Sequence, residues 1–185
     1  MAPKVHRDIH WGHISVLEAA LDCLKLQMLH ALRRHRWRYV QVLAGSDLPL
    51  KTNEEMAAIF KFLNGTSDVQ FHPDDPSRHR HSVVFSQSKR PGGGWLHVNW
   101  LTSKQAPFTL YKGSFGASLS REFVKYIMEA EMASELLKFL SDTYVPDEAF
   151  WPTLAWNNRG KHGRSSCVFG VDSLHRLISA PHLAG

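Results

Sequence analysis

The sequence predicts an α/β fold, built as one domain over residues 1–185. Apolar residues recur at steps of three and four between Ile14 and Met28, which is the period of a helix. An apolar segment at 37–43, a polar loop and a second helical pattern at 52–63 follow. This succession of strand, loop and helix is typical of α/β layering. A chain of 185 residues, 43% of them hydrophobic, is long enough for one sizeable core.

The first half of the chain is expected to contain a helix, a strand and a second helix, in that order. The first helix is expected over residues 14–32, and a short buried strand is expected at 37–43. Thr52 and Glu55 have the spacing of a capping box, so the second helix should begin there and end at 64–65, where Asn is followed by Gly.

The second half begins with residues 72–107, a region rich in Pro, Gly, His and Arg that predicts an elaborated loop with short strands. Small residues at 112–117 indicate a strand or a close approach of two backbones. Ser120 is expected to cap one helix that carries apolar residues as far as Leu140. Another helix should begin at Pro146, and residues 167–179 should add a strand and a small helix.

The charge of the chain favours acidic partners but identifies none. Lys and Arg number 22 against 17 Asp and Glu, for a net charge of +5. The arginines between Arg33 and Arg38 interleave with aromatic residues, a mixture found both at the solvated end of a helix and on nucleic-acid-binding surfaces. No nucleic-acid motif accompanies them, so the solvated helix is favoured and no nucleic-acid partner is expected. No apolar run approaches the ~20 residues that span a bilayer.

The histidines and cysteines predict no metal site. His6, His10 and His13 have permissive spacing, but no Cys or carboxylate completes a tetrahedral set nearby, and Trp11-Gly12 interrupts the helical pattern. Two cysteines, Cys23 and Cys167, are too few to define a disulfide framework or a zinc motif.

An acidic pair, Asp147 and Glu148, follows Pro146 at the expected start of a helix. The positive end of a helix favours the ionised form of a carboxylate, which is the form that can accept a proton. Local pattern alone is compatible with two roles for this pair. It can complement the helix dipole, which is the commoner role, or it can supply a base.

Four ordered blocks of sequence share a likeness with a known family. The blocks cover residues 37–55, 112–124, 142–151 and 164–170. Together they resemble the core-2/I-branching β-1,6-N-acetylglucosaminyltransferases, and the peptide O-xylosyltransferases share a looser version of the pattern. The resemblance runs from about Trp11 to Leu183 and is weak in 72–107.

The resemblance implies a GT-A-type α/β domain that is incomplete, because the N-terminal nucleotide-binding strands are missing from this chain. It implies a type II Golgi membrane protein, lumenal and held by an anchor absent from this chain, that transfers GlcNAc from UDP-GlcNAc to an O-glycan with inversion. In the family the glutamate of the Pro-Asp-Glu motif is the general base, which here is Glu148. Trp11 and Arg164 match donor-binding positions, with Arg164 at the diphosphate. No metal is expected, since the family needs none and Asp-x-Asp is absent here.

The departures from the family concern the acceptor and the ends of the chain. Gln70, Arg78 and His81 fall nearest to the acceptor-binding positions of the family, so the acceptor can differ. Cys23 and Cys167 match disulfide cysteines whose partners lie in missing parts, and the chain looks like a fragment or an incomplete gene model. Two alternatives stay open beside GlcNAc transfer. One is a protein O-xylosyltransferase-like enzyme, and the other is a truncated, non-catalytic glycan-binding relative.

Overall fold

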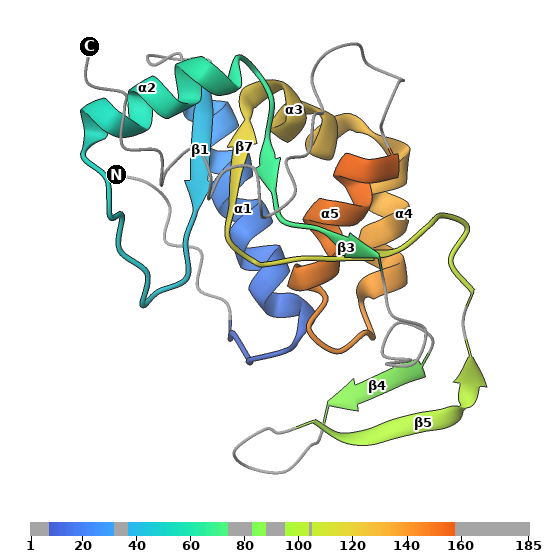
Figure 1. The fold of residues 1–185 in the computed structure, drawn as a ribbon. Helices are drawn as coiled ribbons and strands as arrows, with labels where there is room; N and C mark the ends of the chain where they lie inside the picture. The colour runs from blue at the N-terminus through green and yellow to red at the C-terminus, as the bar shows by residue number, and fades with distance from the viewer. Residues whose placement is uncertain (1–7, 32–36, 74–82, 88–94, 104, 158–185) are drawn as a thin grey trace.

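The computed structural model describes residues 8–31, 37–73, 83–87, 95–103 and 105–157 (Figure 1). These residues form a mixed α/β fold in which helices surround a small antiparallel sheet, as the coarse fold class predicted. Among the described residues, no helix is both long enough and apolar enough to cross a bilayer. The strand at 167–170 and the helix at 172–179 that the sequence predicts lie outside the described residues.

The sheet has three strands in the order β1, β7, β2, and both pairings are antiparallel. Its strands are β1 (Tyr39–Val42), β2 (Asp68–Val69) and the central β7 (Ala117–Ser120), whose four residues are all buried. The sequence predicts a buried strand near 37–43, but only Val42 of β1 is buried. This expectation was wrong in burial because β1 lies at the edge of the sheet, where a strand has a neighbour on one side only.

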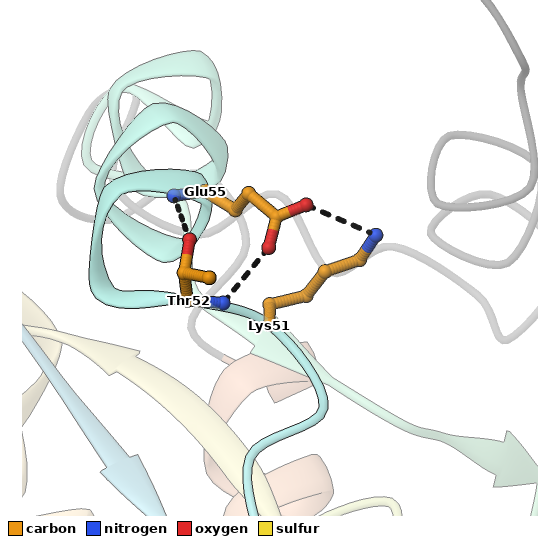
Figure 2. A network of polar contacts seen from close by, with 3 residues as sticks. All are labelled: Lys51, Thr52 and Glu55. Carbon is orange, nitrogen blue, oxygen red and sulfur yellow. Dashed lines mark hydrogen bonds and ion pairs between the residues drawn. The ribbon is translucent and has the colours of Figure 1, made fainter.

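Helices α1 (Ile14–Ala31) and α2 (Asn53–Leu63) begin and end within a residue of their predicted bounds. Figure 2 shows why α2 begins where it does: the Thr52 hydroxyl accepts from the backbone N–H of Glu55, and the Glu55 carboxylate accepts from that of Thr52. These two bonds satisfy donors that have no partner inside the helix. Asn64 then ends α2 in the left-handed conformation, which asparagine tolerates better than most residues.

The single helix predicted from Ser120 to Leu140 is instead two helices. They are α3 (Arg121–Glu129) and α4 (Glu131–Leu140), and Ala130 between them has an extended backbone. Each residue turns a helix by about 100°, so Ile127 and Leu136, nine positions apart, would face opposite sides of one continuous helix. Both are buried in the same core. The break at Ala130 lets both apolar faces turn toward that core.

Helix α5 (Asp147–Asn157) is the most deeply buried helix of the described chain. Phe150, Trp151 and Leu154 are all buried, and so are the residues between them. The helix contacts α4, α1 and strand β2. Burial of each large apolar side chain contributes about 1.5–3 kcal/mol to folding. The position of α5 is therefore fixed from several sides, which matters because it carries Glu148.

Two further strand pairs lie within or beside the region predicted as an elaborated loop. Short strands β3 (His72–Pro73) and β6 (Tyr111–Lys112) pair with each other next to α5. Strands β4 (Val83–Gln87) and β5 (Trp95–Ser103) form a hairpin that extends away from the helices in Figure 1. The short strands that the sequence predicts within residues 72–107 are thus confirmed.

Candidate functional site

The start of α5 presents one carboxylate to solvent. Asp147 is buried, whereas the Glu148 side chain keeps 31% of its accessible surface. The carbonyl of Pro146 accepts hydrogen bonds from the N–H groups of Ala149 and Phe150. Glu148 therefore lies within the first hydrogen-bonded turn of the helix. Of the acidic pair that the sequence singles out, Glu148 is the member placed to meet a ligand.

A proline inside α5 changes the hydrogen bonding at Glu148. Pro152 is four residues beyond Glu148 and has no N–H, so the helix cannot supply the usual donor to the Glu148 carbonyl. The backbone N–H of Gly113 donates to this carbonyl instead, at 2.6 Å. The loop after β6 is therefore bonded directly to the backbone of Glu148.

Gly113 fits this position because it has no side chain. A Cβ added there would lie 2.0 Å from the carbonyl oxygen of Gln70 and 3.2 Å from Cγ of Pro152. Any larger residue would push these backbones apart. The close approach that the small residues at 112–117 predict is confirmed, and its partners are Gln70 and α5.

The strand before Gly113 is held to α5 by side chains as well. The Thr153 hydroxyl accepts from the N–H of Tyr111 at 3.0 Å and donates to its carbonyl at 3.3 Å. Asn157 donates to the carbonyl of Thr109 at 2.7 Å. These bonds align β6 along α5 and place Nζ of Lys112 3.3 Å from Oε2 of Glu148.

The segment before α1 meets the same end of α5. The N–H of Val145 donates to the carbonyl of Gly12 at 2.9 Å, and the Trp11 ring contacts the Tyr144 ring edge to face at 5.6 Å. Val145 has a φ of 54°, which costs an L-residue about 1–2 kcal/mol and is unusual for a β-branched one. Strain of this kind often accompanies functional sites.

His13 fixes the start of α1 next to Trp11. Its Nδ1 accepts from the N–H of Ser15 at 3.1 Å, and the N–H of His10 donates to the Ser15 hydroxyl. Burial lowers the pKa of His13, the charge of His10 lowers it further, and Glu18 acts in the opposite direction. The neutral ring is therefore favoured, and only an unprotonated Nδ1 can accept this hydrogen bond.

This geometry suits proton transfer. A partly exposed carboxylate at a helix N-terminus can accept a proton from a bound hydroxyl, and the ammonium group of Lys112 lies 3.3 Å from this carboxylate. An exposed tryptophan, Trp11, lies against the loop that precedes this helix.

Comparison with known proteins decides the family. The family model of the Core-2/I-Branching enzyme matches residues 3–171, which is most of the chain. The chain belongs to this family.

Individual Core-2/I-branching relatives support the same assignment. A zebrafish (Danio rerio) beta-1,3-galactosyl-O-glycosyl-glycoprotein beta-1,6-N-acetylglucosaminyltransferase 4 is 27% identical over 98% of this chain and 51% of its own length. A human N-acetyllactosaminide beta-1,6-N-acetylglucosaminyl-transferase is 30% identical over 94% of this chain and 50% of its own length. The chain thus spans about half the length of these relatives.

Three of the predicted site residues of this Core-2/I-branching chain are described by the structure. Trp11 contacts Tyr144 in the loop before the helix that carries Glu148. The backbone of Gln70 adjoins Gly113, whose N–H donates to the carbonyl of Glu148. Arg164, Arg78 and His81 lie outside the described residues, so their proposed roles stay predictions. Cys23 has an exposed, free thiol.

Lys112 is a site residue that the sequence pattern does not single out. The small residues at 112–117 indicate only a strand or a close approach of two backbones. A weak signal was present, because Lys112 directly precedes a glycine in one of the four family blocks. The contact with Glu148 itself depends on how β6 lies along α5, which no local pattern encodes.

Proposed function

We propose that this chain is a catalytic part of an inverting glycosyltransferase that moves GlcNAc from UDP-GlcNAc to a hydroxyl of an O-glycan, forming a β-1,6 branch. The observation that carries the proposal is Glu148, a partly exposed carboxylate at the start of a buried helix, in a chain of the Core-2/I-Branching family. The names of the relatives specify β-1,6-N-acetylglucosaminyl transfer, to a galactosyl-O-glycosyl-glycoprotein or to an N-acetyllactosaminide.

The proposed reaction is a single displacement. The acceptor oxygen forms a bond to the anomeric carbon of GlcNAc while the bond from that carbon to the phosphate oxygen breaks, and UDP leaves with the electron pair. The proton of the acceptor hydroxyl passes to the carboxylate of Glu148. A base on the acceptor side of the sugar is what inversion requires, and proton removal of this kind contributes about 10²–10⁴ to the rate.

Charge on the leaving diphosphate is proposed to be met by side chains rather than by a metal. Arg164 is the residue proposed for this role. Trp11 is proposed to contact the nucleotide sugar, and Gln70 the acceptor, together with Arg78 and His81. A lumenal place at the Golgi membrane is part of the same proposal.

The proposal is tested by assaying the full-length protein and its Glu148→Gln variant with UDP-GlcNAc and a core-1 glycopeptide. Glutamine keeps the shape but cannot take the proton, so turnover should fall about 10²–10⁴-fold. Glu131→Gln is the matched control, because Glu131 is also in the first turn of a helix, and it should behave like the wild type.

Other results would point to the alternatives. Normal turnover by Glu148→Gln would remove Glu148 as the base. Transfer from UDP-xylose to a serine-glycine peptide, with none from UDP-GlcNAc, would favour the xylosyltransferase-like enzyme. Failure of this chain to bind UDP in calorimetry, while a version extended at both ends binds it, would favour a truncated, non-catalytic relative.

A further inference from the structure

We propose that Lys112 is a positioning residue, which holds the carboxylate of Glu148 in the orientation needed to receive the proton of the acceptor. The inference rests on the proposed function of Glu148. It begins from the ion pair between Nζ of Lys112 and Oε2 of Glu148, which joins β6 to α5.

The Lys112 and Glu148 pair is more buried than the Lys125 and Glu129 pair on the surface of α3. The Lys112 and Glu148 side chains keep 30% and 31% of their accessible surface, at a separation of 3.3 Å. The Lys125 and Glu129 pair on α3 keeps 63% and 65%, at 3.9 Å. A half-buried pair is screened less by solvent than an exposed one, so its geometry is held more firmly.

The backbone brings the two residues together before their side chains meet. Gly113, the residue after Lys112, donates its N–H to the carbonyl of Glu148 itself, and Tyr111, the residue before it, is held by Thr153. Lys112 is thus fixed on both sides along the helix that carries the base. Less conformational entropy is then lost when the ion pair forms, because the two backbones are already in place.

The position has a consequence for catalysis. A glutamate side chain has several rotatable bonds, and a base works only when its oxygen is within hydrogen-bonding reach of the proton that it removes. A displacement of about 1 Å costs as much as 100-fold in rate. An ammonium group on Oε2 limits rotation of the carboxylate without needing to touch the sugar.

The first test compares the kinetics of Lys112→Met, Lys112→Arg and Glu148→Gln with those of the wild-type full-length protein. Methionine keeps most of the side-chain length but not the charge, so kcat should fall about 10–100-fold while KM for the donor changes less than about twofold. Arginine should restore most of the lost kcat. Lys125→Met removes the lysine of the exposed pair and should leave kcat unchanged.

The double variant Lys112→Met with Glu148→Gln separates positioning from a role elsewhere. If Lys112 acts through Glu148, adding Lys112→Met to Glu148→Gln should lower the residual activity less than about twofold. A full second loss in the double variant would overturn the inference. So would normal kcat in Lys112→Met, or a folded Lys112→Arg protein with no rescue.

A measurement independent of catalysis keeps the inference distinct from the proposed function. Side-chain order of Glu148, followed by NMR relaxation in labelled protein, should fall in Lys112→Met and not in Lys125→Met. Unchanged order would overturn the positioning role even if Glu148 proves to be the base. Inactivity of Lys112→Met beside full activity of Glu148→Gln would instead overturn the proposed function and, with it, the catalytic part of this inference.

Discussion

At Gly113, next to the candidate site, two backbone segments approach too closely for any side chain to fit between them. The N–H of Gly113 reaches the Glu148 carbonyl that Pro152 leaves without a helical donor, and its missing side chain lets Gln70 lie against it. Proline and glycine are usually placed where a chain turns. Here the two cooperate inside the fold, since one exposes an acceptor and the other brings a donor to it.

Replacement of Gly113 by alanine should lower stability sharply. The new Cβ would lie 2.0 Å from a backbone oxygen, which cannot move as the end of a flexible side chain can. We expect the free energy of unfolding to fall by about 3 kcal/mol, measured by urea denaturation.

Gly45→Ala is the matched control for this change. No atom lies within 4 Å of a Cβ added at Gly45, and its φ is outside the left-handed range. The same substitution should therefore leave stability unchanged or raise it by up to about 1 kcal/mol. Equal effects at the two glycines would contradict the close approach at Gly113.

At the scale of the element, the start of α2 shows how a short sequence pattern fixes a helix boundary. The hydrogen bond that the Thr52 N–H donates to the Glu55 carboxylate, at 2.8 Å, is the main reason that the pKa of Glu55 is lowered. The ammonium group of Lys51, 3.6 Å from the same carboxylate, lowers this pKa further (Figure 2). A folded-state pKa below the unfolded one means that the ionised carboxylate stabilises the fold. This contribution is present above the unfolded pKa and is lost as the pH falls through the folded pKa.

The variant Glu55→Gln tests this linkage. Glutamine can still accept the hydrogen bond but does not titrate, so wild type should be more stable than the variant at about pH 6, and the difference should shrink toward about pH 3. Unfolding by urea, followed by circular dichroism, measures both values. Glu54→Gln, in the same helical turn, is the control. A constant difference across this range would contradict the role of the ionised capping box.

The break between α3 and α4 is an element-scale feature that local rules do not predict. No proline or glycine lies near Ala130, and each half has good helical periodicity. The reason for the break is global: Ile127 and Leu136 must both reach one core. Ending a helix at Ala130 gives up helical hydrogen bonds, but it allows two apolar faces to be buried instead of one, and this burial offsets the loss.

At the scale of the whole molecule, the chain divides into a helical body around the small sheet and a hairpin of β4 and β5. These two strands pair with each other and with no other described strand. Strand β7, by contrast, is paired on both sides and completely buried. A two-stranded hairpin has little stability by itself, so the two parts should differ in how readily they open.

Native-state hydrogen exchange should show this difference directly. We expect the amides of β4 and β5 to exchange at least about tenfold faster than those of β7, because the hairpin can open without disturbing the core. Mass spectrometry of peptides from each strand gives the comparison. Equal protection of the hairpin and of β7 would show that both open in one cooperative step.

The sequence by itself determined the features that short-range patterns encode. The period of apolar residues gave α1, the spacing of Thr52 and Glu55 gave the start of α2, and Pro146 with its acidic pair gave the start of α5. The ordered blocks pointed to the family to which the chain belongs. The helix signals depend on residues that are neighbours along the chain, and the family signal depends on the order of blocks along it, so neither requires the tertiary structure.

Only the tertiary structure decided which distant residues meet. It turned Asp147 into the core and left Glu148 partly exposed, broke the helix at Ala130, and laid β6 along α5 so that Lys112 reaches the Glu148 carboxylate. These outcomes follow from the packing of several elements at once. That packing must bury apolar side chains without gaps and must also give each buried backbone N–H a hydrogen-bond acceptor. No single segment carries that information, because each contact joins residues that are far apart in the chain.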